Sequence, residues 1–460
     1  MTVRPNSPEA RDAASVVHPL TNLKTHLEKG PVVIEEGHGV WVKDIHGKDY
    51  IEGMSGLWCL ALGYGQERLV EAAAAQMRRL PYYHLTNHKS HSPVIELAEK
   101  LLEIAPVPMS KIWFANSGSE GNDSAARIAW YYWAAVGQPQ RRKIIAHRQA
   151  YHGNTIASAS LSGMFYNHAS FGLPLGGFLH VTPPHHYRFA EPGESEDAFA
   201  TRLAGELDAL IQAEGPETVA AFFTEPVMGS GGVIVPPPTY YEKIQAVLAK
   251  YDILLVADEV ITGFCRTGNM FGTTTMGLRP DMLVCAKGLS SAYLPISALM
   301  LNARVFDAIA EESDRVGVFG LSFTYSGHPV SAAVAREAIA IYEEQDVVGH
   351  VRRVGAHMQA GLRRFLDHPL VGEVRGVGLV AGVELVADKT SGAPFDKSLA
   401  VGPWCNARAE EHGLIVRAIG DTISFCPPLI ITEAEIDEML ARFGRALDDT
   451  AAWLGLDTAQ

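Results

Sequence analysis

The sequence predicts an α/β protein with a large, mostly parallel sheet that helices cover on both faces, and a smaller α+β domain. The first observation is that continuous apolar runs alternate with helix-like stretches through the middle of the chain. Strands of a parallel sheet are buried on both faces and therefore read as continuous apolar runs. The second is a length of 460 residues with 47% hydrophobic and 20% charged residues, which is typical of a globular protein with a large core.

Residues 1–65 are predicted to form an N-terminal arm and part of the small domain. Three prolines interrupt residues 1–30, so only short helical pieces are expected there. Residues 31–52 alternate apolar side chains with glycine turns, which predicts small strands.

Residues 66–326 are predicted to form the large domain. Helix-like stretches alternate there with apolar runs, as in repeated strand–helix–strand units. The helix-like stretches are 67–80, 93–105, 122–136, 197–213 and 239–250, and the apolar runs are 111–117, 143–147, 219–227, 253–260, 282–288 and 296–302.

Residues 327–460 are predicted to complete the small domain. A long helical region begins near residue 327, and strands return after residue 370. A helix is expected over 400–412, a strand over 413–417 and a closing helix over 432–452.

Charge and cysteine content narrow the function classes. The net charge of −14 argues against nucleic acid or an anionic membrane surface as a partner, because both require concentrated Lys and Arg. No apolar run reaches the length of a membrane span, and the first residues lack a signal-peptide pattern. The five cysteines are scattered without metal-ligand spacing, so we expect a reduced, cytoplasmic protein with no metal site.

Two residues that end apolar strands suggest the chemistry. Taken alone, Lys287 reads as a strand-end lysine that reaches water, and Asp258 as a cap or surface pair. Pyridoxal phosphate (PLP) requires just this pair, a lysine for its aldehyde and an acid for its ring nitrogen. The two residues are separated by about one strand–helix–strand crossover, which places them on nearby strands.

Further residues fit the same cofactor. Ser117, Gly118 and Ser119 stand at a strand-to-helix junction, where free N–H groups bind anions such as phosphate. Tyr151 is placed to stack on the cofactor ring, and Val260 lies on the same side of its strand as Asp258. Individually these residues are equally typical of a capped helix and a packed core.

The motifs resemble those of the class III aminotransferases over about residues 30–450. The matching segments are FANSGSEGND (114–123), AYHGNT (150–155), TEPVMGSGGVIVPP (224–237), LLVADEVITGFCRTG (254–268), CAKGLSS (285–291) and FTYSGHP (323–329). Within that class, GLWCLALGYG (56–65) and LIVRAIGD (414–421) resemble the amine:pyruvate group, the ω-transaminases.

The resemblance implies a PLP fold type I homodimer with shared active sites, or a tetramer of such dimers. It implies that Lys287 carries the cofactor and moves the substrate proton, while Asp258 pairs with the ring nitrogen. The other implied cofactor contacts are Ser117, Gly118, Ser119, Tyr151, His152, Glu225, Val260 and, from the partner subunit, Thr324. The implied substrate contacts are Trp58, Leu85, Thr86, Tyr151 and Arg417, of which the arginine binds a carboxylate and withdraws for an uncharged group.

One departure concerns the pocket wall after Tyr82 and Tyr83. Related amine:pyruvate enzymes often carry aromatic residues there, whereas this chain has Thr86 and Asn87. The pocket is therefore expected to be roomier and to suit long-chain or polar amines, polyamines included.

The expected reaction moves the amino group of a primary amine to pyruvate, giving an aldehyde or ketone and L-alanine. The alternatives are another class III reaction, such as an aminomutase, a phospholyase or a different keto-acid acceptor, and a catalytically silent PLP fold. A Rossmann dehydrogenase lacks support, because no GxGxxG motif follows the first strand.

Overall fold

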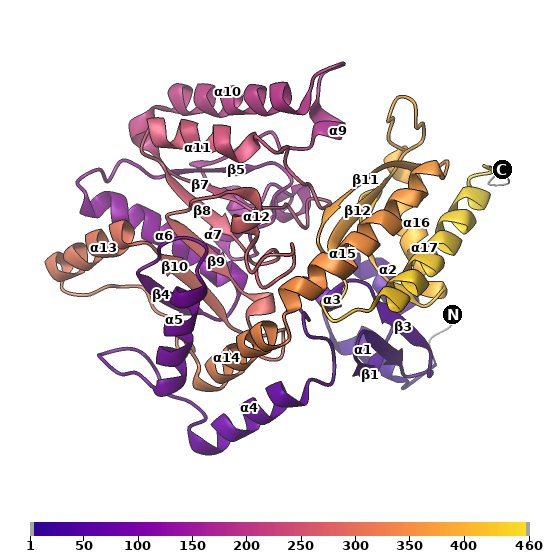
Figure 1. Ribbon diagram of the computed structural model, residues 1–460, viewed down its shortest axis with the longest axis horizontal. Helices are drawn as coiled ribbons and strands as arrows, with labels where there is room; N and C mark the ends of the chain where they lie inside the picture. Colours follow the sequence, from indigo (N-terminus) through magenta and orange to yellow (C-terminus); the bar gives the residue numbers. More distant parts are fainter. Residues whose placement is uncertain (1–3, 457–460) are drawn as a thin grey trace.

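The computed structural model describes residues 4–456, and its centre is a seven-stranded sheet with the order β4-β10-β9-β8-β7-β5-β6 (Figure 1). Its strands are β4 (Lys111–Ala115), β5 (Lys143–His147), β6 (Phe178–Val181), β7 (Val219–Thr224), β8 (Leu254–Asp258), β9 (Met282–Cys285) and β10 (Ser297–Leu301). Strand β10 runs antiparallel to both neighbours, and the other pairs are parallel. The predicted mostly parallel sheet is thus confirmed.

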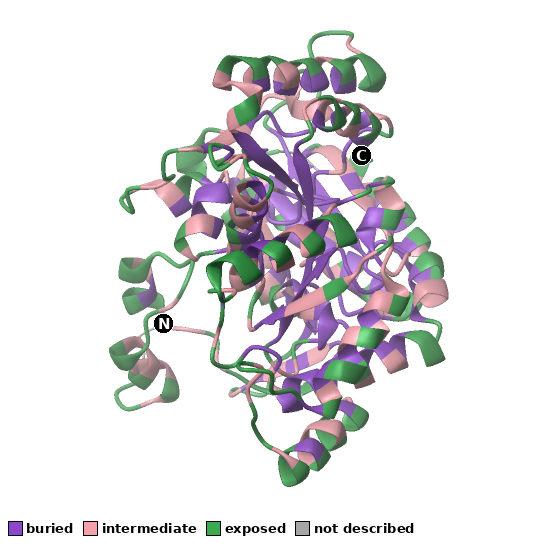
Figure 2. Ribbon diagram, turned by 90° about the vertical axis from the view of Figure 1, so that its left-hand side faces the viewer, coloured by how far each residue is buried: buried purple, intermediate pink, exposed green. Residues whose placement is uncertain are grey.

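Alternating side chains explain why these strands read as continuous apolar runs. In β7, Phe223 packs into one core cluster and Phe222 into the cluster on the opposite face. In β5, Ile144 and Ile145 divide between the same two clusters. Successive side chains of a strand point to opposite faces, and here both faces are covered. Figure 2 accordingly shows the central strands as buried and the outer helical faces as exposed.

Three groups of helices cover the sheet. On one face lie α6 (Gly118–Ala135), α7 (Ile156–Leu161) and α13 (Ala303–Val316). On the other lie α10 (Glu196–Glu214) and α11 (Tyr240–Lys250), which pack together. The third group is α4 (Glu67–Arg79), α5 (Ser92–Ile104) and α14 (Pro329–Glu344). The short edge strand β6 and helix α13 were not among the predicted elements.

Two four-stranded sheets lie beside this unit, on the right in Figure 1. The first joins β1 (Ile34–His38), β2 (Trp41–Asp44) and β3 (Asp49–Glu52) to β13 (Leu414–Ile415). The second is antiparallel and joins β11 (Val371–Val377), β12 (Val380–Leu385), β15 (Thr422–Phe425) and β14 (Arg417–Ile419). N-terminal strands thus pair with a C-terminal strand, and the division at residues 65 and 326 stays a prediction.

The remaining elements are short helices and the helices of the C-terminal region. They are α1 (Pro8–Ser15), α2 (Leu23–Lys29), α3 (Ser55–Trp58), α8 (Phe165–His168), α9 (His186–Phe189), α12 (Gly272–Met276), α15 (Val347–Arg363), α16 (Val401–Glu411), α17 (Glu433–Trp453) and the 3-10 turns at Pro216–Thr218, Lys287–Leu289, Arg364–Asp367 and Lys397–Leu399.

The predicted strand over 413–417 is wrong in one respect, because it is two strands. β13 pairs in parallel with β3, and β14 pairs antiparallel with β15, so the chain passes from one sheet to the other at Val416. Val416 is buried, and its side chain belongs to the main core. The switch makes Arg417 the first residue of a three-residue strand.

A buried histidine at the end of β5 predicts a pH dependence of stability. His147 is fully buried, its Nε2 lies 2.6 Å from the Tyr240 hydroxyl, and burial lowers its pKa to about 3, with the nearby His152 and His180 adding to the effect. An unfolded histidine has a pKa of about 6.5. Between these values the unfolded chain binds more protons, so the free energy of unfolding falls as the pH drops below about 6.5.

The expected loss at pH 4.5 relative to pH 7 is about 3 kcal/mol from this group alone. His147→Gln cannot titrate and should lose about that much less between the two pH values. Denaturant unfolding of both proteins at pH 7 and pH 4.5 measures the difference. Equal losses in the two proteins would contradict the assignment.

Candidate active site

Lys287 and Asp258 lie at the carboxyl ends of adjacent parallel strands. Asp258, the last residue of β8, pairs with Val284 of β9, and Lys287 follows the end of β9 by two residues. Lys287 has a φ of 47°, a left-handed conformation that costs a non-glycine residue about 1–3 kcal/mol. The two residues were predicted to stand on nearby strands, and the strands that carry them to this edge, β8 and β9, are direct neighbours.

Asp258 is held by donors on both of its oxygens. Oδ2 accepts from the Asn122 side-chain amide at 2.7 Å and lies 2.8 Å from Nδ1 of His152, and Oδ1 accepts from the Val260 N–H at 3.0 Å. The side chain is only 3% exposed. Because all these partners donate to the carboxylate, they fix the orientation of the acid.

The arrangement around His152 raises the pKa of its imidazole. Burial alone would lower the pKa of its imidazole, but the hydrogen bond and the negative charge of Asp258 outweigh burial and raise it. Its Nε2 is buried and has no hydrogen-bond partner within residues 4–456. A buried ring nitrogen without a partner beside the acid is the kind of polar atom that a bound molecule or a water satisfies.

Glu225 lies next to this pair. Its Oε1 accepts from the Tyr151 N–H at 3.1 Å, and its Oε2 accepts from the Gly229 N–H at 2.9 Å. Burial raises the pKa of Glu225 to about 7, while the positive charge of His152 opposes the change and the negative charge of Asp258 adds to it. Through its two hydrogen bonds, Glu225 connects the turn after β5 with the segment after β7.

The Lys287 ammonium makes no hydrogen bond or ion pair to any residue between 4 and 456. Burial lowers its pKa, although the negative charges of Asp258 and Glu225 oppose the change. A lysine with a depressed pKa is neutral more often, and the neutral amine is the nucleophile and base.

The N-terminus of α6 provides an anion site near this acid. Ser117 caps the helix by accepting from the Glu120 N–H at 3.2 Å, which leaves the N–H groups of Gly118 and Ser119 without an acceptor among the described residues. The Ser119 hydroxyl accepts from the Asn154 N–H at 3.1 Å and keeps its own proton to donate. Free N–H groups and the helix dipole together favour a phosphate.

Glycines bring the backbone of this turn close to its neighbours. A Cβ on Gly118 would lie 2.9 Å from the Val260 side chain, and a Cβ on Gly153 would lie 2.5 Å from the Ser119 hydroxyl oxygen. Val260, the residue expected under the cofactor ring, is therefore in contact with the expected phosphate turn. The predicted cofactor residues, Ser117, Gly118, Ser119, Tyr151, His152, Glu225, Asp258, Val260 and Lys287, form one neighbourhood in the single chain, with Thr324 apart.

Arg417 stands at the edge of this neighbourhood without a partner. Its guanidinium makes no hydrogen bond or ion pair within the described part of the chain. Burial raises the pKa of both Tyr151 and Tyr166, and the positive charge of Arg417 opposes both changes. The arginine therefore lies within electrostatic reach of the two tyrosines.

Trp58 is buried, with 2% exposure, in a cluster with Val227, Ile261 and Cys426, against which Ile419 of β14 packs. Its indole N–H is buried without a partner among residues 4–456. The cluster links Trp58 to the segments after β7 and β8 and to the strand that carries Arg417.

Three predicted site residues are not brought to Lys287 within one chain. Leu85 and Thr86 line a separate cavity of about 900 Å³ together with residues 317–323. Thr324 is exposed, and its carbonyl accepts from the Tyr82 hydroxyl at 2.8 Å in the same region.

Sequence reasoning missed Asn122 and Tyr166. Asn122 donates to Asp258 at 2.7 Å and to the His152 carbonyl at 2.9 Å. It lies one helical turn after Gly118, so the i, i+4 spacing placed it on the same face as the phosphate turn and was the available signal. Nothing in the local sequence marked Tyr166, which reaches Arg417 only through the fold.

A nucleophilic lysine reacts with a carbonyl group. PLP is a cofactor with such a carbonyl, and it also requires an acid for its ring nitrogen and an anion site for its phosphate. The chain offers all three, and the unpartnered ring nitrogen of His152 and the open N–H groups of α6 fit the same group. The fold and site therefore define a PLP enzyme.

The chain belongs to the class-III aminotransferase family, whose profile matches residues 24–447. It is similar to gamma aminobutyrate transaminase 3, chloroplastic, of Solanum lycopersicum, with 47% identity over 93% of this chain and 82% of that protein. The omega transaminase of Pseudomonas jessenii in complex with PMP superposes with a TM-score of 0.96 and 55% identity, covering 98% of this chain and 99% of that one. A transaminase with L-alanine has a TM-score of 0.91 and 57% identity, covering 92% of this chain and all of that one.

These findings make the chain a PLP-dependent aminotransferase whose substrates are an amine and a keto acid. When bound, PLP supplies an electron-withdrawing ring that stabilises negative charge at the substrate carbon. Within residues 4–456, no helix has both the length and the apolar character needed to cross a membrane.

The residues divide the remaining work among themselves. The Lys287 amine is available to take the substrate Cα proton and to return it at the neighbouring carbon, since no ion pair holds its ammonium. Asp258, fixed by Asn122 and His152, would be the residue that faces the ring nitrogen of the bound cofactor. Ser119 and the start of α6 are placed to hold the phosphate.

Proposed function

We propose that this aminotransferase moves the amino group of a primary amine to pyruvate, giving an aldehyde or ketone and L-alanine. The observation that carries the proposal is that Arg417 has no partner among residues 4–456 and lies within electrostatic reach of Tyr151 and Tyr166. A planar guanidinium binds a carboxylate through two parallel hydrogen bonds, and its long stem lets it withdraw for an uncharged group. One pocket thereby accommodates a keto acid in one half-reaction and an amine without a carboxylate in the other.

The proposed donors are long-chain or polar primary amines, polyamines among them. Thr86 and Asn87 are exposed and polar at positions where aromatic side chains would narrow the pocket. A small polar wall excludes neither a long alkyl chain nor a second ammonium group.

A donor panel tests this proposal. Initial rates of alanine formation from pyruvate are measured with a diamine, a long-chain amine, a small aryl amine and γ-aminobutyrate. We expect the first two donors to be the fastest. A sharp preference for the small aryl amine would contradict the roomy pocket, and absence of alanine from every donor would contradict pyruvate as acceptor.

Arg417→Leu is expected to raise the KM for pyruvate by about 10- to 100-fold, because a hydrogen bond to a charged group contributes about 1.5–3 kcal/mol. The half-reaction with an amine that lacks a carboxylate should change by less than about threefold. Steady-state kinetics with pyruvate and single-turnover kinetics with the amine measure the two effects. Arg445→Leu, on the exposed face of α17, is the matched control, and equal losses with both substrates would contradict the assigned role.

γ-Aminobutyrate is the second candidate donor, because a relative at 47% identity is a gamma aminobutyrate transaminase. This donor has its own carboxylate, so Arg417 would bind in both half-reactions. Arg417→Leu would then weaken donor and acceptor alike, which separates the two candidates.

The shared active site of a homodimer is part of the proposal, as is a cytoplasmic location. Thr324, Leu85 and Thr86 lie apart from Lys287 in the single chain, and large apolar side chains are exposed nearby in sequence, among them Val318 at 65% and Tyr325 at 61%. A second copy would bury them and supply Thr324. Light scattering of the purified protein tests the dimer, and a mass of one chain would contradict it.

A further inference from the structure

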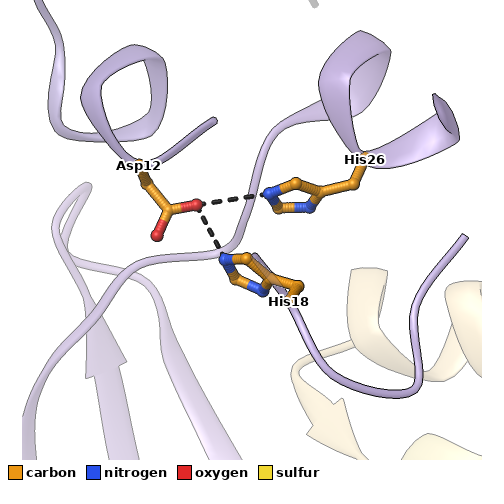
Figure 3. Close-up of side chains that lie close together, drawn as sticks. All are labelled: Asp12, His18 and His26. Carbon is orange, nitrogen blue, oxygen red and sulfur yellow. Dashed lines mark hydrogen bonds and ion pairs between the residues drawn. The ribbon is translucent and has the colours of Figure 1, made fainter. Parts of the chain in front are cut away.

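Three side chains of the N-terminal arm converge on one point, far in sequence from every residue of the active site (Figure 3). Asp12 lies on α1, His26 on α2 and His18 in the connection between them. Oδ1 of Asp12 is 2.8 Å from Nε2 of His18 and 3.2 Å from Nε2 of His26. The three atoms all lie within 4.8 Å of one another, and the two imidazole rings are tilted by 31° to each other with their centroids 4.0 Å apart.

We propose that Asp12, His18 and His26 form a binding site for Zn²⁺. Zinc takes imidazole nitrogen and carboxylate oxygen at about 2.0–2.2 Å, and a tetrahedral site then separates its ligand atoms by about 3.3 Å. The two Asp12–His distances are within about half an ångström of that separation. Small side-chain rotations would therefore open the cluster around an ion.

Hydrogen bonds among these three side chains leave one carboxylate oxygen of Asp12 without a partner in the described chain. A carboxylate only accepts, so both histidines would have to donate from Nε2 to the single oxygen Oδ1, while Oδ2 of Asp12 has no partner in the described chain. A cation would instead take the lone pair of each Nε2 and either or both carboxylate oxygens. Imidazole and carboxylate together suit zinc better than calcium or magnesium, which prefer oxygen alone.

The burial of the cluster suits a bound ion that keeps a solvent ligand. The His26 side chain is 8% exposed, while those of His18 and Asp12 are 28% and 24% exposed. The ion would be shielded on the His26 side and reachable from the other. Three protein ligands plus water satisfy a tetrahedral zinc ion.

The arm has little else to hold its two helices together. Helix α1 has no buried residue, and His26 is the one buried residue of α2. The apolar side chains of the arm are mostly exposed: Val16, Val17, Leu20, Leu23 and Leu27. Segments too small to bury a core are commonly stapled by a metal or a disulfide, and this cluster joins α1 to α2.

A second cluster of potential metal ligands differs from the first, because arginine side chains already neutralise its carboxylates. His185, Glu373 and Glu384 also bring their atoms within 4.8 Å of one another. There the Arg375 guanidinium donates to both carboxylates at 2.5 Å, and Arg188 pairs with Glu384 as well. A guanidinium already neutralises that cluster, whereas no Lys or Arg pairs with Asp12 among residues 4–456.

Calorimetric titration of the chelator-treated holoenzyme with Zn²⁺ tests the site. Wild type should bind one ion per chain at the arm, and Asp12→Asn and His18→Gln should each weaken that binding at least about tenfold. His46→Gln is the matched control, because this exposed histidine only pairs with Glu9 of α1, and it should bind as wild type does. Wild type that binds no zinc, or variants that bind as tightly as wild type, would overturn the proposal.

Two further readouts separate ligation from loss of folding. Co²⁺ in place of Zn²⁺ should give visible absorption from a nitrogen and oxygen site in wild type that is absent in His26→Gln. Zn²⁺ should also slow trypsin cleavage after Lys24 and Lys29, both on α2, in wild type and not in His18→Gln. Cleavage that zinc slows equally in both proteins would place the ion elsewhere and overturn the proposal.

Discussion

Lys287→Ala is expected to lower the rate of amino transfer by at least about 10³-fold, because it removes both the nucleophile that carries the cofactor and the base that takes the substrate proton. Among residues 4–456, no other lysine stands at the carboxyl ends of the central strands to replace the lost amine. The measurement is alanine formation from pyruvate with the best donor of the panel. The cofactor content of the purified variant is measured beside it.

Two variants sharpen the test. Lys287→Arg keeps the positive charge but cannot be deprotonated, so it should be as inactive as the alanine variant if chemistry rather than charge is what Lys287 supplies. Lys143→Ala removes a lysine from the opposite end of the same sheet, where it pairs with Glu214 at 2.7 Å, and should stay within about twofold of wild type. Activity in Lys287→Arg close to wild type would contradict the assigned role.

The central sheet could be predicted because burial on both faces leaves a trace in the sequence. The runs at 219–227 and 253–260 are apolar at successive positions, and the structure places Phe222 and Phe223 in cores on opposite faces. Strand β6 was missed because Phe178–Val181 is a short edge strand, two of whose four residues are only partly buried. Such a strand lacks the composition that marks its neighbours.

The cofactor end of the site could also be predicted, because its residues stand at the ends of strands. Asp258 and Lys287 end apolar runs, and neighbouring parallel strands bring their carboxyl ends together. Asn122 was missed although it bonds to Asp258, because its i, i+4 spacing from Gly118 shows which helix face it shares but not that this face meets Asp258.

The substrate end and the arm depend on long-range packing, which sequence spacing does not contain. Arg417 comes within electrostatic reach of Tyr151 and Tyr166 after the chain changes sheets at Val416, and the predicted continuous strand over 413–417 did not anticipate that change. The expectation of no metal site rested on the cysteines. Asp12, His18 and His26 share no ligand spacing of a known motif, and only the folding back of α2 on α1 brings them together.

Asp258→Asn is expected to lower the rate of amino transfer by about 10²-fold. An opposite charge shifts the pKa of a nearby group by about 1–3 units, so removing this carboxylate costs the ring nitrogen about 1.4–4 kcal/mol of electrostatic stabilisation. The same change removes the charge that raises the pKa of His152. The amide NH₂ of the variant must also face either the Val260 N–H or the donors of Asn122 and His152, which leaves one donor unpaired.

An unpaired buried donor also destabilises the fold, so the control variant must carry a similar buried Asp→Asn change away from the active site. Asp281 accepts from the Leu255 N–H at 3.0 Å and from the Asn302 amide at 2.9 Å, at the opposite end of the same strands. Asp281→Asn should lower the unfolding midpoint to a similar extent while turnover per folded molecule stays within about twofold of wild type. If Asp258→Asn lost no more turnover per folded molecule than this control, its carboxylate would act by holding the structure together and not by its charge on the reacting centre.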